Sequence, residues 1–309
     1  MKLALVFPGQ GSQSVGMMQG FADNAVVRAV FAEASAALGQ DLWQLVETGP
    51  AEELSATVNT QPVMLTAAYA TYRAWQEAGG PAPALVAGHS LGEYTALVAA
   101  GALAFADALP LVRFRAQAMQ EAVPMGSGAM AAVLGLDDDA VRAACAEAAQ
   151  GETVEAVNFN APSQVVIAGH KSAVERAAAA AKARGAKRAL LLPVSAPFHS
   201  SLLKPAAARL KARMADVAFD APRIGVINNV DVAMPADPSA IRDALARQAC
   251  NPVRWVETIQ SFAAQGITHV VECGPGKVLS GLTKRIDGNL QSFAVTDAAS
   301  LAQTLEALK

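Results

Sequence analysis

The chain has 309 residues, of which 53% are hydrophobic and 17% are charged, and its formal net charge is −3. This composition excludes an intrinsically disordered chain and is sufficient for one large domain or two modest domains with a sizeable core. The small negative charge gives no global reason to expect nucleic-acid binding.

The first predicted element is a strand over Leu3–Phe7, which ends at Pro8-Gly9. Its apolar run is too short for a signal peptide, and the uncharged stretch from Tyr94 to Ala106 is too short to span a membrane. The three cysteines are Cys145, Cys250 and Cys273. Their wide spacing without a CxxC pattern indicates buried thiols in a reducing compartment, so we expect a cytoplasmic protein with no membrane contact.

Short apolar runs alternate with helix-like segments along most of the chain, which predicts an α/β fold with a mainly parallel sheet. The predicted strands of this sheet are Leu3–Phe7, Leu85–Ala87, Ile224–Asn228 and His269–Cys273. Each run is followed by Gly, Pro or Asn, the residues that commonly end a strand.

The stretch between Pro124 and Pro197 departs from this alternation. Its predicted strands are Met130–Leu134, Val154–Phe159, Val165–Ala168 and Ala189–Leu192, with a helix after the first strand and another after the third. This element order is ferredoxin-like. We therefore predict a ferredoxin-like subdomain over residues 125–195, inserted into an α/β-hydrolase-like catalytic domain formed by residues 1–124 and 196–309.

The segment Gly88-His89-Ser90-Leu91-Gly92 matches the nucleophile-elbow pattern G-x-S-x-G. A strand-like run precedes it and a helix-like segment, Leu91–Ala100, follows it, which is the context that the pattern requires. Small residues at both ends let the backbone pass closely, and the helix N-terminus offers N–H groups to an oxyanion. The pattern predicts Ser90 as a nucleophile, with a structural glycine-rich turn as the alternative.

A serine nucleophile needs a base, and the chain has four histidines. His269 lies in an apolar strand pattern, His170 follows a strand of the inserted subdomain, and His89 is placed to support the turn. His199 lies where the chain re-enters the large domain, in the kind of loop that often carries catalytic residues. Elimination therefore favours His199 as the base, against a hydrogen-bonded loop histidine.

No carboxylate stands out as the third member of a triad. Glu93, Asp107 and Glu121 follow Ser90 but have the pattern of helix-surface or cap residues. We therefore expect a Ser–His dyad, in which another acceptor fixes the imidazole tautomer.

The predicted helix from Ala106 to about Val123 carries Arg115 on its apolar face. A buried guanidinium is costly unless it is paired. Its partner is either a structural carboxylate or the carboxylate of a substrate, which a guanidinium binds in a bidentate manner. Position in the sequence does not decide between the two.

Seven segments occur in the order seen in malonyl-CoA:acyl-carrier-protein transacylases, which the chain resembles from end to end. They are Phe7-Pro8-Gly9-Gln10-Gly11-Ser12-Gln13, Gly88-His89-Ser90-Leu91-Gly92-Glu93-Tyr94, the Arg115 segment, Val157-Asn158-Phe159-Asn160, Phe198-His199, Arg247-Gln248 with Asn251-Pro252, and Glu272-Cys273-Gly274-Pro275-Gly276. The resemblance is to the stand-alone enzyme of bacterial fatty-acid synthesis.

This resemblance implies that Ser90 is acylated and that His199 is its general base. It implies that Arg115 holds the free carboxylate of a malonyl group. The backbone N–H groups of Gln10 and Leu91 would form the oxyanion hole.

The resemblance further implies that the main-chain carbonyl of Gln248 orients the histidine, so that a substitution of the Gln248 side chain would have less effect than its position suggests. Phe198 resembles the residue of malonyl-selective members, and Asn158 and Asn160 are assigned with it to pocket selectivity. No metal or bound cofactor is implied, and a monomer is the family expectation.

The implied substrates are malonyl-CoA and acyl carrier protein, joined by a ping-pong mechanism. The carrier is acidic in this family, so a basic patch is expected beside the site, although ordinary solvated side chains are an equal alternative for each candidate. The candidates are Lys187-Arg188, Lys204, Lys277 and Lys284-Arg285. A serine hydrolase or thioesterase, and a non-catalytic module that docks the carrier, are the rival interpretations.

Overall fold

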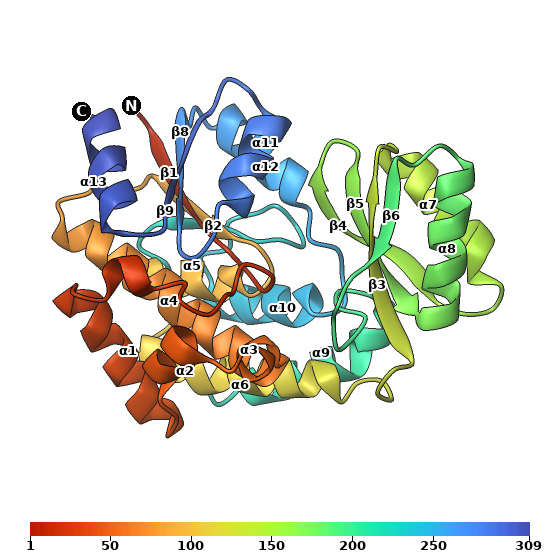
Figure 1. Cartoon of the computed structure of the whole chain (residues 1–309), viewed down its shortest axis with the longest axis horizontal. Helices are drawn as coiled ribbons and strands as arrows, with labels where there is room; N and C mark the ends of the chain where they lie inside the picture. The colour runs from red at the N-terminus through yellow and green to blue at the C-terminus, as the bar shows by residue number, and fades with distance from the viewer.

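The structure is a computed structural model that describes residues 1–309. Figure 1 shows a larger domain that carries both chain termini and a smaller domain at the right of the view. None of the helices combines the length and the apolar character needed to span a bilayer.

The larger domain contains a five-stranded parallel sheet. Its strands are β1 (Leu3–Phe7), β2 (Leu85–Gly88), β7 (Gly225–Ile227), β8 (His269–Cys273) and β9 (Gln291–Val295). They lie in the order β7-β2-β1-β8-β9. The four strands expected from the sequence are confirmed to within two residues at either end. The edge strand β9 was missed because its run is short and only two of its five residues are buried.

Helices cover both faces of this sheet. They are α1 (Ala25–Leu38), α2 (Leu42–Thr48), α3 (Ala51–Ser55), α4 (Thr57–Glu77), α5 (Gly92–Ala99), α6 (Phe105–Gln120), α9 (Lys204–Met214), α10 (Pro238–Gln248), α11 (Trp255–Ala264), α12 (Val278–Ile286) and α13 (Ala298–Ala307). Strand β1 is buried along its whole length, and its residues alternate between two hydrophobic clusters. One cluster includes α4, α5 and α6, and the other includes α11 and α12. Such burial on both faces explains the continuous apolar run of the strand.

The smaller domain is an antiparallel sheet with two helices. Its elements are β3 (Gly128–Leu134), α7 (Asp138–Ala149), β4 (Val154–Ala161), β5 (Gln164–His170), α8 (Lys171–Ala183) and β6 (Arg188–Leu191). The strand order β4-β5-β3-β6 is that of a ferredoxin-like fold, as the sequence predicts. A separate hydrophobic cluster lies within residues 131–189. The boundaries at 125 and 195 stay a prediction.

Two sets of hydrogen bonds connect the smaller domain to the larger one. Strand β4 exchanges backbone hydrogen bonds with Val253, at 3.0 Å from Phe159 N to Val253 O and 2.8 Å from Val253 N to Val157 O. Glu155 of β4 accepts two hydrogen bonds from Ser201, one from the backbone N–H and one from the hydroxyl, both at 2.7 Å. The smaller domain thereby holds the loop that contains His199.

Strand β8 buries a carboxyl group, Glu272, that bears on stability. One of its oxygens accepts the backbone N–H of Ser280 at 2.8 Å in the first turn of α12, and the other has no hydrogen-bond partner. Burial raises the pKa of Glu272 from 4.5 to about 7.

We predict that raising the pH from 4.5 to 7 destabilises the wild-type protein relative to Glu272→Gln. In that window the folded protein retains a proton that the unfolded chain releases, so the contribution of this group to the free energy of unfolding falls with pH, by at most about 3 kcal/mol. Urea denaturation of both proteins at pH 5 and pH 8 measures the difference. A difference that is the same at both pH values contradicts the prediction.

Candidate active site

Ser90 lies on a sharp turn between β2 and α5. Its backbone φ is 53°, a left-handed conformation that a non-glycine residue adopts rarely. A Cβ on Gly88 would lie 1.9 Å from backbone atoms of Gly92, and a Cβ on Gly92 would lie 2.1 Å from the carbonyl oxygen of Phe7. Both glycines of the pattern are therefore required by close backbone approach, as the sequence indicates.

His199 lies against the hydroxyl group of Ser90. Its Nε2 is 2.7 Å from Ser90 Oγ, and its Nδ1 is 2.8 Å from the main-chain carbonyl oxygen of Gln248. Because a carbonyl only accepts, we assign the proton to Nδ1, which leaves Nε2 free to accept the serine proton. Burial, with the nearby Arg115 charge as the second cause, lowers the pKa of His199 from 6.5 to about 3, so the imidazole is neutral near pH 7.

The backbone N–H groups of Gln10 and Leu91 have no acceptor in the protein. Both residues line the same cavity as Ser90 and His199. Gln10 follows β1, where its side chain donates a 3.2 Å hydrogen bond to Thr57 Oγ1. Leu91 directly precedes α5, so its N–H belongs to the positive end of that helix. Two free donors beside a nucleophile are what an oxyanion hole requires.

Arg115 reaches the site from α6 and is only 2% exposed. Its Nη1 donates to Gln61 Oε1 at 2.9 Å, and its Nη2 donates to Gln248 Oε1 at 2.9 Å and to Ser90 Oγ at 3.2 Å. All three acceptors are neutral. Arg115 takes part in none of the ion pairs of the structure, so the structural carboxylate that the sequence left open is absent.

These groups surround a cavity of about 120 Å³ between the two domains. Its wall consists of Gln10, Gln61, His89, Ser90, Leu91, Arg115, Met130, Asn158, Val166, Leu192, Val194, Phe198 and His199. The apolar part of this wall comes mostly from the smaller domain and from the segment where the chain leaves it. The cavity has room for a short acyl group, with the serine hydroxyl and the guanidinium next to each other in its wall.

A family profile described as an acyl transferase domain matches residues 4–300. The chain is 58% identical to a malonyl CoA-acyl carrier protein transacylase of Escherichia coli K12 over 306 residues, covering 99% of each protein. It is 43% identical to the protein of the same name from Bacillus subtilis 168, covering 100% of this chain and 98% of that one. The chain belongs to the malonyl-CoA:acyl-carrier-protein transacylase family.

Solved structures of similar proteins support the same family membership. An acyl-carrier-protein S-malonyltransferase from Burkholderia pseudomallei 1710b is 69% identical, with a TM-score of 0.98 and coverage of 99% of this chain and 100% of that one. A malonyl-transacylase in complex with a type II polyketide acyl-carrier protein is 54% identical, with a TM-score of 0.98 and the same coverage. The resemblance found in the sequence is thus confirmed, together with the fold.

The transacylase site contains two residues that sequence analysis missed. Asn229, in the loop after β7, accepts the Ser90 N–H at 2.7 Å through Oδ1 and donates to the Gly88 carbonyl at 2.8 Å through Nδ2. Gln61 of α4 holds Arg115. The sequence gives a weak indication for Asn229, because it follows a predicted strand. It gives none for Gln61, because the role of Gln61 depends on its tertiary contact with Arg115.

The structure separates the two asparagines that the sequence assigned to the pocket. Asn158 lines the cavity, and its Oδ1 is buried without a hydrogen-bond partner. Asn160 lies outside the wall, where its Oδ1 is 2.7 Å from His89 Nε2. His89 therefore supports the turn, as expected, with Asn160 as its partner. Phe198 lies in the wall, and its role in selectivity stays a prediction.

The expectation that Glu93 is a helix-surface residue is wrong. Glu93 is 2% exposed, because α5 is buried on every side from Gly92 to Val98 and has no solvent face. Asp107 and Glu121 are exposed, as expected.

The Gln248 side chain has more partners than the resemblance implied. The main-chain carbonyl orients His199 as expected, but the amide is fully buried as well. Its Nε2 donates to the Ser90 carbonyl and to Glu93 Oε2, both at 2.9 Å, and its Oε1 accepts from Arg115. The side chain therefore links the nucleophile, the guanidinium and a buried carboxyl group.

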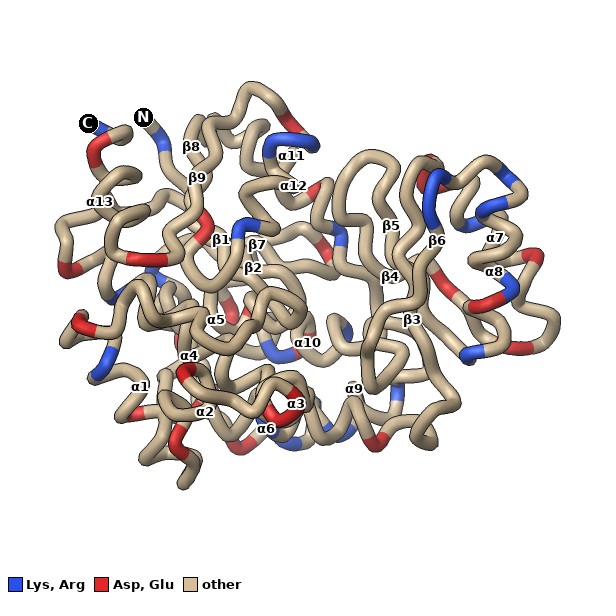
Figure 2. The backbone as a smooth tube through the Cα atoms, in the orientation of Figure 1, with Lys and Arg blue, Asp and Glu red and all other residues tan.

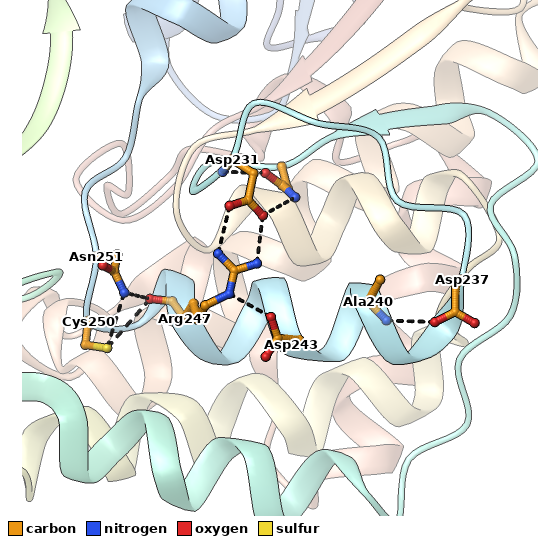
Figure 3. A network of polar contacts seen from close by, with 8 residues as sticks. Asp231, Asp237, Ala240, Asp243, Arg247, Cys250 and Asn251 are labelled. Atoms are coloured by element: carbon orange, nitrogen blue, oxygen red, sulfur yellow. Dashed lines mark hydrogen bonds and ion pairs between the residues drawn. The ribbon is translucent and has the colours of Figure 1, made fainter.

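An ion-pair network holds the end of α10 that carries Gln248 (Figure 3). Arg247 donates two 2.7 Å hydrogen bonds to the carboxylate of Asp231 and a third, also 2.7 Å, to Asp243. Asn251 Nδ2 donates to the Arg247 carbonyl at 2.8 Å. The bidentate pair connects α10 to the loop after β7, which carries Asn229.

The basic residues expected to meet a carrier protein are all exposed. Figure 2 shows basic and acidic residues spread over both domains, with the two signs interspersed. The basic docking patch stays a prediction.

We predict that Gln248→Leu destabilises the protein by about 2–4 kcal/mol, because it removes the buried partners of both Arg115 and Glu93. Urea denaturation measures the change. Gln44→Leu is the matched control, since Gln44 is exposed and its side chain makes no hydrogen bond. Equal stability of the two variants would contradict the importance of the Gln248 side chain.

Proposed function

We propose that the chain transfers a malonyl group from malonyl-CoA to the phosphopantetheine thiol of acyl carrier protein, through an ester on Ser90. Membership of the transacylase family supports this activity. The observation that carries the choice of acyl group is Arg115, a buried cation without an anionic partner, 3.2 Å from the serine hydroxyl. A malonyl thioester brings the carboxylate that this guanidinium lacks.

In the first half-reaction His199 Nε2 takes the proton of Ser90 as Oγ attacks the thioester carbonyl. The negative charge that develops on the carbonyl oxygen is stabilised by the backbone N–H groups of Gln10 and Leu91. The carbon–sulfur bond then breaks, and the imidazolium returns its proton to the CoA thiolate. The product is a malonyl-serine ester and free CoA.

The second half-reaction runs through the same groups in reverse order. His199 takes the proton of the phosphopantetheine thiol, and the sulfur attacks the ester carbonyl. The same two N–H groups stabilise the oxyanion, and Ser90 leaves with the proton from the imidazolium. Every bond is made or broken by protein and substrate groups, so the proposal includes no metal or redox cofactor, and it retains the cytoplasmic location expected from the sequence.

The malonyl carboxylate is held by Arg115, whose guanidinium lies beside Ser90. Gln61 and Gln248 fix the guanidinium from outside, so its orientation is set before the substrate arrives. Pre-organisation of this kind lowers the entropic cost of binding. An acetyl group has no carboxylate and leaves the cation unpaired, which disfavours it.

We predict that Arg115→Ala lowers the rate of Ser90 acylation by malonyl-CoA at least about a hundredfold, because a charge-assisted bidentate pair is lost. Acylation by acetyl-CoA should change far less. Intact-protein mass spectrometry measures both rates. Arg113→Ala is the matched control on the same helix, because Arg113 is bonded to the Leu38 carbonyl and to Gln40, away from the cavity. Equal losses with the two thioesters would exclude the carboxylate clamp.

Intact-protein mass spectrometry also tests the proposed function. Wild-type protein should gain a malonyl mass that is absent in Ser90→Ala and that moves to holo acyl carrier protein on addition. An adduct that decays to free malonate without reaching the carrier would indicate a hydrolase instead.

A further inference from the structure

Glu93 lies one turn after Ser90 on α5, behind the nucleophile and outside the cavity wall. One of its carboxylate oxygens, Oε2, accepts two hydrogen bonds, from the backbone N–H of Asn229 and from Nε2 of Gln248, both at 2.9 Å. These partners belong to the loop after β7 and to the end of α10. A single buried oxygen therefore joins three segments that are far apart in the sequence.

Both partners of Glu93 hold the reacting groups. Asn229 clamps the elbow from two sides, through the N–H of Ser90 and the carbonyl of Gly88. Gln248 donates to the Ser90 carbonyl and, through its own main-chain carbonyl, holds Nδ1 of His199. Glu93 contacts neither Ser90 Oγ nor the imidazole. It is hydrogen-bonded to Asn229 and Gln248, and these two residues hold the backbone of Ser90 and Nδ1 of His199.

The charge of Glu93 sets the orientation of the Gln248 amide. The amide presents Oε1 to the guanidinium of Arg115 and Nε2 to the carboxylate. A flipped amide would direct N–H groups at a cation and an oxygen at an anion, so the two charges select one orientation. An ionised carboxylate is also a stronger acceptor than a neutral one.

We propose that Glu93 is a positioning residue of the transferase, whose carboxylate holds Asn229 and Gln248 so that Ser90 and His199 keep their reactive geometry. The inference rests on the proposed function only for the name of the reaction, because the geometry concerns the nucleophile and its base. A purely structural role predicts lower stability alone, whereas a positioning role predicts slower reaction of a folded protein.

Burial also gives this role a pH dependence. The pKa of Glu93 is raised from 4.5 to about 7, chiefly by desolvation. Arg115 of α6 opposes the rise and Asp231 of the loop after β7 adds to it, while β7 and α10 face Glu93 with apolar side chains and Gln248. Because the pKa of His199 is about 3, protonation of the base does not occur near neutral pH. A loss of serine reactivity below pH 7 that disappears in Glu93→Gln is therefore assigned to Glu93.

The test measures the reaction of Ser90 with phenylmethylsulfonyl fluoride, a small neutral probe that does not need Arg115. Intact mass spectrometry follows the labelling rate from pH 5 to pH 9 in the wild type, Glu93→Gln and Glu93→Asp. Asp107→Asn is the matched control, an exposed carboxylate in the first turn of α6. Thermal unfolding of each protein reports whether it is folded.

We expect the wild-type rate to rise with pH through about 7. Glu93→Gln removes the charge, so its rate should be about tenfold to a hundredfold lower at pH 8 and should not rise through 7. Glu93→Asp keeps the charge but shortens the reach, so it should be slow yet retain the rise. Asp107→Asn should match the wild type.

Three results would overturn the inference: a wild-type rate that does not change between pH 6 and 8, a folded Glu93→Gln protein with the wild-type rate and profile, or a Glu93→Asp protein with the wild-type rate. The last decides the matter if Glu93→Gln does not fold. Failure of the proposed function is separate, since it would appear as wild-type protein that reacts with the probe but takes no malonyl group from malonyl-CoA.

Discussion

The site is organised around one buried positive charge that has no carboxylate beside it. Removing an ion from water costs several kcal/mol even after relaxation, and Arg115 recovers part of this cost only through neutral oxygens of Gln61, Gln248 and Ser90. The carboxyl group of Glu93 is connected to the guanidinium through the amide of Gln248. In the proposed function, a substrate that brings its own carboxylate completes the pair, so recognition of the acyl group also relieves an unfavourable burial.

The parallel sheet explains why the polar groups can meet at this charge. Strands β7, β2 and β1 are neighbours, and their carboxyl ends carry Asn229, Ser90 and Gln10 respectively. Open α/β sheets place their ligands at this edge because the connecting loops gather there. The smaller domain supplies the apolar side of the cavity, and its Glu155 fixes the loop of His199 through Ser201. The base is thereby positioned by both domains together.

Sequence reasoning succeeded where a single local rule was sufficient. The buried strands follow from continuous apolar runs, the ferredoxin-like order from the spacing of short elements, and the sharp turn at Ser90 from a pattern whose glycines have a steric reason. It failed for Glu93, because one charged residue in a helix normally indicates a solvent face and α5 has none. It missed the contacts of Gln61 and of the Gln248 side chain, because neutral amides have no sequence signal when their partners are assembled by tertiary packing.

The same cation acts on both partners of the proposed proton transfer. Arg115 contributes to the low pKa of His199, which makes the imidazole a weaker base, but it also lies 3.2 Å from Ser90 Oγ, where it stabilises negative charge on the nucleophile. Both effects lower a pKa. The ease of proton transfer depends on the difference between the pKa values of Ser90 and His199, and this difference changes less than either value. A carboxylate bound to the guanidinium weakens both effects together. In the first half-reaction, in which Ser90 is the nucleophile, a bound malonyl carboxylate therefore changes the ease of proton transfer less than it changes either pKa.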